Sequence, residues 1–152
     1  MEQEKVKDWQ ELWIKYFTFD ALIGNTDRHQ DNWGILYKSK GNYLSPAFDN
    51  GTSMGREILE KYINRGYHHI RLSQNDAEHV NHMKLIEILL KKFGKKAKRI
   101  IINMLSFNDK ELEEILEYLV ELTNINPLSK RRAYFIRKLI LKRKELLLRL
   151  VR

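Results

Sequence analysis

The sequence contains no cysteine, which excludes disulfide bonds and any zinc or iron–sulfur site built on thiolates. It also lacks a run of roughly 18 uninterrupted apolar residues, the length that a membrane-spanning helix needs. The opening segment MEQEKVKDWQ mixes acids and bases and has no apolar core of a secretory signal. Proline is scarce, with 2 residues, and no stretch rich in proline, glycine and serine marks a linker. These absences predict a cytoplasmic chain without a membrane partner.

What the chain does contain is sufficient for one folded domain. Its 152 residues are 43% apolar and 11% aromatic, which is enough to build a buried core. No internal repeat or change in composition marks a boundary within it. We therefore expect a single domain that spans residues 1–152.

Positive charge is in excess: 28 lysine and arginine residues stand against 20 aspartate and glutamate residues, a net charge of +8. Such a surplus favours polyanionic partners, among them nucleic acids, nucleotides and acidic proteins. Solvated helix faces account most simply for the clustered cations, because long basic side chains also cover apolar surface. A nucleic-acid contact through the carboxy-terminal cluster is the alternative. The two clusters are Lys91, Lys92, Lys95, Lys96, Lys98 and Arg99, and then Lys130, Arg131, Arg132, Arg137, Lys138, Lys142, Arg143, Lys144, Arg149 and Arg152.

The first part of the chain predicts one helix and one β-hairpin. Apolar residues recur at spacings of three and four from Trp9 onward, the period of an amphipathic helix, and Gly24 marks its end. The β-prone residues 33–37 and a second short run at 43–44, separated by a polar turn at 39–42, predict a small hairpin. The polar residues between helix and hairpin therefore lie on a helix-to-strand connection.

The second part of the chain predicts helices. Residues 49–73 contain glycines and lack a sustained period, so we expect a long loop with one short helix at 54–63. From Asp76 onward the pattern is helical, with asparagine–glutamate capping boxes and a glycine stop between apolar stripes. The fold class is thus mostly α with a small β-hairpin, and residues 76–152 form a helical bundle. The expected helices begin after Asn75 (with Glu78), Gly94, Asn108 (with Glu111) and Asn126, and the last one ends near Leu150.

A polar loop, GNTDRHQDN, follows the first helix and carries a spacing typical of phosphoryl transfer. Asp27 precedes Asn32 by five positions, and Asp49 follows the hairpin in FDNG. Phosphoryl transfer needs a carboxylate that accepts the proton of the attacking hydroxyl, and oxygen ligands that hold magnesium on the nucleotide phosphates. In kinase catalytic loops the base aspartate and the metal-binding asparagine have the same interval, and a second metal-binding aspartate follows a hairpin and precedes a glycine. The order of these three residues favours a phosphotransferase site within residues 19–53.

The stretch GNTDRHQDNWGIL, followed by LSPAFDNG, resembles the carboxy-terminal kinase lobe of HipA-like serine/threonine kinases, the toxins of bacterial toxin–antitoxin systems. Phosphoinositide kinases share the DRH-x-x-N core, whereas Asn25 and the LSPAFD segment favour the HipA-like family. The resemblance implies that Asp27 is the catalytic base, supported in the catalytic loop by His29 and Asn25. It also implies that Asn32 and Asp49 bind Mg²⁺ and, through it, ATP.

The same resemblance implies partners. The family phosphorylates serine or threonine in proteins of the translation machinery, with an aminoacyl-tRNA synthetase as the expected class of target. A complete kinase of this family has an amino-terminal lobe with a phosphate-covering loop and a lysine, whereas this chain begins only a short helix before the catalytic loop. We therefore expect a separate N-lobe or an antitoxin as partner, and little turnover without the missing half of the nucleotide site.

Two other functions stay open from the sequence. An inactive kinase remnant could serve as a protein- or nucleic-acid-binding module. A metal-dependent phosphohydrolase could use Asp27, His29 and Asp49 around two ions. The pair His68 and His69 is a further candidate for a metal or phosphate site, although such loop pairs are more often plain surface.

Overall fold

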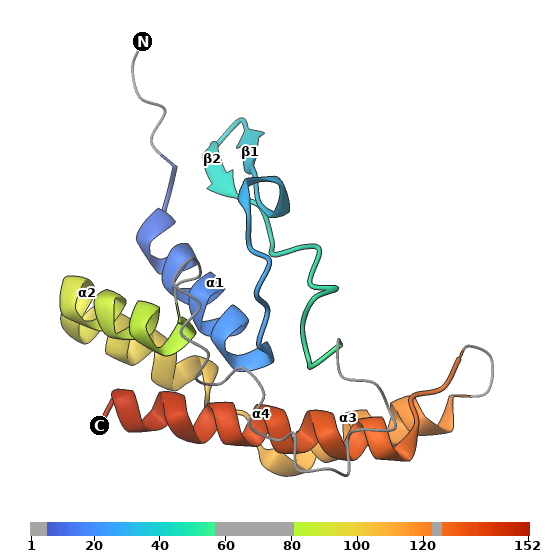
Figure 1. Ribbon diagram of the computed structural model, residues 1–152. Helices are drawn as coiled ribbons and strands as arrows, with labels where there is room; N and C mark the ends of the chain where they lie inside the picture. The colour runs from blue at the N-terminus through green and yellow to red at the C-terminus, as the bar shows by residue number, and fades with distance from the viewer. Residues whose placement is uncertain (1–5, 57–80, 123–125) are drawn as a thin grey trace.

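Helices dominate the computed structural model, which describes residues 6–56, 81–122 and 126–152 (Figure 1). The predicted fold class, mostly α with one small hairpin, is confirmed for these residues. His68, His69 and most of the helix predicted at 54–63 lie outside the described residues. In chain order the elements are α1 Trp9–Ile23, the 3-10 turn η1 Gln30–Asn32, β1 Ile35–Lys38, β2 Gly41–Leu44, α2 His82–Met104, α3 Asp109–Glu121 and α4 Lys130–Leu150.

α1 ends where the sequence predicts. Gly24 has a φ of 71°, a left-handed conformation that a residue without Cβ adopts at little cost, and its amide donates to the Asp20 carbonyl at 2.8 Å. At the other end of the helix the Trp13 ring packs edge-on against Trp33, with 5.1 Å between centroids. This aromatic contact joins α1 to the chain that enters the hairpin.

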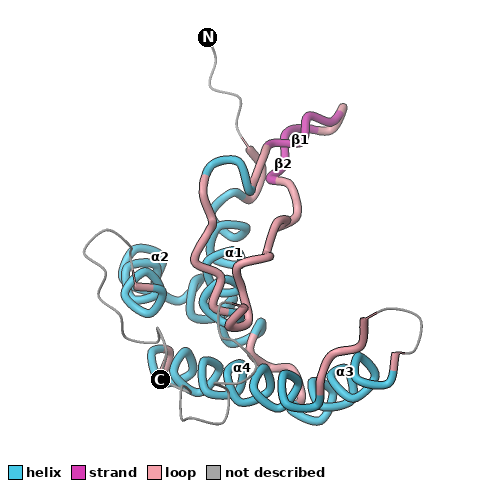
Figure 2. Tube along the Cα trace, turned by 45° about the vertical axis from the view of Figure 1, so that its right-hand side comes forward, coloured by secondary structure: helices cyan, strands magenta, loops and turns pink. Residues whose placement is uncertain are grey.

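The hairpin forms with a shorter turn than predicted. β1 and β2 are antiparallel, with Ile35 opposite Leu44 and Lys38 opposite Gly41. The turn therefore consists of residues 39–40 and not 39–42. Gly41 has a φ of 124°, which glycine tolerates, so that strand pairing resumes immediately after two residues. Figure 2 shows the two loop segments on either side of the hairpin running back along α1.

α2 differs from the prediction at its start and in its middle. It begins at His82 and not near Asp76, because Asn81 has non-helical angles and its side chain accepts from the Met83 amide at 2.8 Å. The predicted cap at Asn75 lies outside the described residues. The two helices predicted around Gly94 form one element that is broken at this glycine, whose φ of 50° and ψ of −128° are not helical.

α3 begins with the capping box that the sequence predicts. The Asn108 side chain accepts from the Lys110 amide at 2.9 Å, and the Asn108 amide donates to the Glu111 carboxylate at 3.2 Å. Both bonds satisfy amide groups that have no partner within the helix. The start of α3 is therefore set by local sequence.

α4 begins at Lys130, and the prediction of a start after Asn126 is wrong. The Leu128 amide donates to the Leu119 carbonyl at 3.0 Å, which holds this segment against the end of α3. Ser129 then supplies the cap by accepting from the Arg132 amide at 3.0 Å. A contact between the two helices thus selects the later of two competing caps.

Two groups of buried apolar side chains hold the helices together, and α4 contributes to both. The first group joins α1, α2 and α4 and consists of Ile14, Ala21, Ile86, Leu89, Ala97, Ile100, Ile101, Leu105, Leu147 and Val151. The second joins α3 to α4 and consists of Leu116, Ala133, Phe135, Ile136, Leu139 and Ile140. Within the described ranges, no helix has both the length and the apolar content to cross a membrane.

Candidate active site

A buried ion pair lies beneath the polar loop. Arg28 reaches back to α1, where its Nε donates to Asp20 Oδ2 at 3.0 Å and its Nη2 to Asp20 Oδ1 at 2.8 Å. Only 6% of the Arg28 side chain and 2% of the Asp20 side chain are exposed. Hydrogen bonding to Asp20 raises the pKa of Arg28, so this guanidinium is charged whenever the protein is folded.

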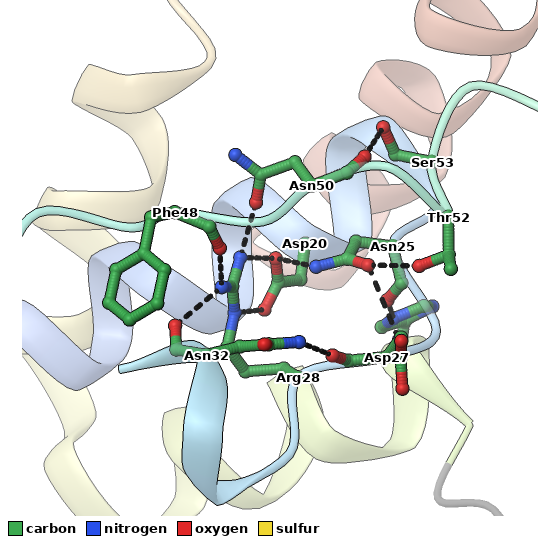
Figure 3. Close-up of polar contacts among 10 residues, drawn as sticks. Asp20, Asn25, Asp27, Arg28, Asn32, Phe48, Asn50, Thr52 and Ser53 are labelled. Atoms are coloured by element: carbon green, nitrogen blue, oxygen red, sulfur yellow. Dashed lines mark hydrogen bonds and ion pairs between the residues drawn. The ribbon is translucent and has the colours of Figure 1, made fainter. Parts of the chain in front are cut away.

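Arg28 also binds both segments that carry the predicted metal ligands. Its Nη1 donates to the carbonyl oxygens of Asn32 at 2.9 Å and Phe48 at 2.7 Å, and its Nη2 donates to Asn50 Oδ1 at 2.6 Å (Figure 3). Phe48 and Asn50 are the chain neighbours of Asp49. One guanidinium therefore holds the backbone before Asp49 and the side chain after it, and it anchors Asn32 as well.

Asn25 connects the same segments from a second position. The residue is 1% exposed, and its Nδ2 donates to Asp20 Oδ1 at 3.0 Å. Its Oδ1 accepts from the Asp27 amide at 3.3 Å and from the Thr52 hydroxyl at 2.8 Å (Figure 3). The structure thus places Asn25 below the loop, where it joins α1 to the loop and to the chain after Asp49.

Asn32 is held by its amide nitrogen. The residue is 2% exposed, and Nδ2 donates to the backbone carbonyl of Asp27 (Figure 3). Since this bond occupies the donor end of the amide, the oxygen is the end that can contact a cation. The bond also links the predicted base residue directly to a predicted metal ligand.

Asp27, His29 and Asp49 lie on the exposed side of the site. The Asp27 and His29 side chains are each 50% exposed, with 3.7 Å between Asp27 Oδ1 and His29 Nε2. His29 Nδ1 accepts from the Asp31 amide at 3.2 Å and so caps η1. Asp49 has a φ of 50°, which is uncommon for a residue with a side chain. Within the described part of the chain, neither the Asp27 nor the Asp49 carboxylate accepts a hydrogen bond.

The oxygen donors present suit Mg²⁺, which is bound largely by phosphates and water, better than a metal ion whose ligands come mainly from protein side chains. Among the described residues, no three histidine, aspartate or glutamate side chains come together as a metal-binding group. The alternative of a phosphohydrolase with two ions around Asp27, His29 and Asp49 therefore gains no support. Mg²⁺ usually takes one or two protein oxygen ligands besides phosphates and water. Asn32 and Asp49 have oxygens of the required kind.

A family model for the HipA-like C-terminal domain matches residues 1–124. The chain belongs to this family. The resemblance found in the loop and in FDNG is thus confirmed at the level of the family. The matched residues include α1, the loop, the hairpin, α2 and α3, while α4 follows them. No curated protein and no solved structure matches the chain.

Two residues that organise the loop of this HipA-like domain were not identified from its sequence. Arg28 lies within the motif, but its residue type alone assigns it no chemistry. Asp20 does carry a signal, since it is the single charge in the apolar stretch YFTFDALI. A carboxylate at a buried helix position needs a cationic or hydrogen-bonding partner, and the first cation that follows Asp20 in the chain is Arg28.

α4 contacts the carboxyl end of α1 through Arg143. Arg143 is 4% exposed, and its Nη1 donates to the Ala21 carbonyl at 2.8 Å. A cation is favoured there because the last carbonyls of a helix carry partial negative charge. Burial nevertheless lowers the pKa of Arg143 to about 10. Gly24 gives the guanidinium room, since an added Cβ would lie 3.1 Å from Arg143 Cζ.

The first residue of α2 also contacts the loop. His82 Nε2 lies 2.6 Å from the carbonyl oxygen of Asn25. Burial lowers the pKa of His82, and the positive charge of Arg143 lowers it further, while the bond to Asn25 and the charge of Asp20 act in the opposite direction. The neutral ring, with its proton on Nε2, therefore suits this position.

We expect the free energy of unfolding to fall as the pH drops below about 6.5. In that range the unfolded chain protonates its histidine at the ordinary pKa of 6.5, whereas folded His82 has a lowered pKa and stays neutral. Urea denaturation at a series of pH values measures the effect. His82→Gln keeps a donor for the Asn25 carbonyl but does not titrate, so part of the pH dependence should disappear. An identical pH profile in this variant would contradict the assignment.

Proposed function

We propose that the chain is the catalytic lobe of an ATP- and magnesium-dependent serine/threonine protein kinase of the HipA-like class. The observation that carries the proposal is the position of Arg28, which bonds to the carbonyls of Asn32 and Phe48 and so holds the two predicted ligand segments together. Membership of the HipA-like C-terminal domain family supports it. The bond from the side-chain nitrogen Nδ2 of Asn32 to the backbone carbonyl of Asp27 supports it as well.

Asp27 acts in this proposal as the base that orients the substrate hydroxyl. The hydroxyl oxygen attacks the γ-phosphorus of ATP, the bond to the bridging oxygen breaks with departure of ADP, and Asp27 accepts the hydroxyl proton. The carboxylate is suited to this role because it is half exposed and its own amide is bonded to buried Asn25. Rigid support of the loop keeps the base in place without covering it.

Asn32 and Asp49 would hold Mg²⁺, which when bound neutralises negative charge on the transferred phosphate. Arg28 bonds to the carbonyls of Asn32 and of Phe48, the residue before Asp49, and Asn25 accepts from the Asp27 amide. Arg28 and Asn25 are therefore positioning residues. His29 is a third, since it caps η1 and lies beside Asp27. A protein serine or threonine as substrate, an aminoacyl-tRNA synthetase as its class, and a separate N-lobe or antitoxin as partner belong to the proposal through the family resemblance.

Binding of Mn²⁺ with ATP tests the cation site directly. Mn²⁺ replaces Mg²⁺ and broadens the NMR signals of nearby amide groups, so the signals of residues 27, 32 and 49–51 should broaden at low Mn²⁺–ATP concentrations. Asp49→Asn should weaken this binding about tenfold or more, equivalent to roughly 1.4 kcal/mol or more, because it removes a charged ligand.

Asp31→Asn is the matched control for this titration. Asp31 is the neighbour of Asn32 and its side chain is 81% exposed, so its loss changes the net charge of the loop equally. The control should bind Mn²⁺–ATP like the unmodified protein. Equal weakening by the two variants would show only a general effect of charge. Absence of selective broadening in the unmodified protein would favour the alternative, an inactive remnant that serves as a binding module.

A further inference from the structure

Most cations of α4 take part in contacts within the protein. Arg143 is buried under the end of α1, and Lys144 lies 2.6 Å from Asp109 Oδ1 while also donating to a backbone carbonyl of the α2–α3 connection. The remaining contacts follow the same pattern: Arg132 with the Gly55 carbonyl, Arg137 with Glu113, Lys138 with the Tyr134 ring, and both Lys142 and Arg149 with Glu145. This helix therefore offers less free positive charge than its sequence suggests.

The cations of α2 are in a different situation. All six cations between residues 91 and 99 are exposed, and no acidic residue occurs between Glu87 and Asp109. Among the described residues, Lys91, Lys95 and Arg99 have no hydrogen-bond or ion-pair partner. Glu11 of α1 is near enough to Arg99 and Lys96 for their charges to lower its pKa, after the larger effect of Lys15. The other three have weak contacts: Lys92 with the Phe93 ring, Lys96 with Gln10, and Lys98 with the Arg152 carbonyl.

These exposed cations lie on both sides of the break in α2 at Gly94. Lys91 and Lys92 precede the break, and the other four follow it. Lys95 and Arg99 are one turn apart on the second segment, where Ala97 and Ile101 are buried in the first core. An added Cβ at Gly94 would meet nothing within 4 Å. The backbone is therefore accessible at this point.

We propose that this surface, which we call the α2 basic face (Lys91, Lys92, Lys95, Lys96, Lys98 and Arg99), binds the phosphate backbone of a nucleic acid without reading its sequence. Lysine and arginine side chains without internal partners bind phosphates with release of counterions, which drives such association. A membrane surface fits less well, because an interfacial helix inserts its apolar face and that of α2 is buried against α1 and α4. The proposal does not depend on kinase activity.

Fluorescence anisotropy with a labelled DNA duplex of about 20 base pairs tests the proposal, with binding measured between about 50 and 200 mM salt. The logarithm of the binding constant should fall linearly with the logarithm of the salt concentration. Combined K91Q, K95Q and R99Q substitutions remove three phosphate contacts and should reduce the steepness of this line by about 2.7 on DNA. A single-stranded RNA of equal length, measured in parallel, shows which nucleic acid binds more tightly.

The matched control removes the same charge elsewhere. Combined K110Q, K130Q and K138Q substitutions change three exposed cations of α3 and α4, and this variant should keep the salt dependence of the unmodified protein. Circular dichroism verifies that both variants fold. An equal loss in the two variants, a larger loss in the control, or no binding at low salt would overturn the proposal. Binding to anionic vesicles without binding to either nucleic acid would overturn it as well.

Discussion

Replacing Arg28 by methionine should lower the free energy of unfolding by about 3–5 kcal/mol, the usual cost of removing one partner from a buried ion pair. The variant leaves the Asp20 carboxylate, 2% exposed, without its counter-ion. It also removes the bonds to the carbonyls of Asn32 and Phe48, so the two ligand segments lose their common anchor. Urea denaturation measures the stability, and the Mn²⁺–ATP titration should show that binding is lost.

A double variant separates loss of the anchor from loss of stability. Adding Asp20→Asn to Arg28→Met removes the uncompensated charge, so much of the stability should return. Binding of Mn²⁺–ATP should stay weak, because the guanidinium nitrogen that bonds to both the Asn32 and the Phe48 carbonyl is still missing. If the folded double variant bound Mn²⁺–ATP as tightly as the unmodified protein, the positioning role of Arg28 would be refuted while the cation site itself would stand.

Replacing Leu147 by alanine should lower the free energy of unfolding by about 2–5 kcal/mol, the range for large-to-small changes in a core. Leu147 is 0% exposed and packs with side chains of α1 and α2, so the cavity would open between three helices. Arg149→Ala, two positions further along the same helix, changes a side chain that is 60% exposed and should cost no more than about 0.5 kcal/mol.

The same experiment tests the prediction of a single domain. All three tryptophans lie in the first 33 residues, so their fluorescence reports on α1 and the entry to the hairpin. Far-UV circular dichroism reports mainly on α2, α3 and α4, which contain most of the helical residues. Both signals should change at the same urea concentration, in the unmodified protein and in Leu147→Ala. Separate transitions would contradict a single cooperative unit.

Features set by neighbouring residues could be predicted from the sequence. The end of α1 at Gly24 and the capping box at Asn108 each depend on residues within one helical turn, and both predictions are confirmed. The start of α4 was predicted too early because two local caps compete, and the bond between the amide of Leu128 and the carbonyl of Leu119 decides between them. Local signals do not contain that contact.

The candidate site divides in a similar way. The order of Asp27, Asn32 and Asp49 is a property of the sequence, and a motif can represent it. The anchoring role of Arg28 cannot be recognised from the sequence, because its partners Asp20 and Phe48 lie 8 and 20 positions away along the chain. The distribution of positive charge is a similar case. Composition predicts that the chain favours polyanionic partners, but the position of the exposed cations depends on which lysines and arginines pair with acidic residues in the folded chain.

The bonds of Arg28 also affect how the hairpin can change in evolution. The carbonyls of Asn32 and Phe48 accept from the same nitrogen of Arg28, so the segments before and after the hairpin are held at one position. The Ser45 amide, bonded to the Gly34 carbonyl at 2.8 Å, closes the hairpin a second time just beyond it. Insertions and deletions at the tip, residues 38–41, can therefore alter its length without displacing Asp49. A single residue inserted between Asp27 and Arg28 would separate the base from its anchor.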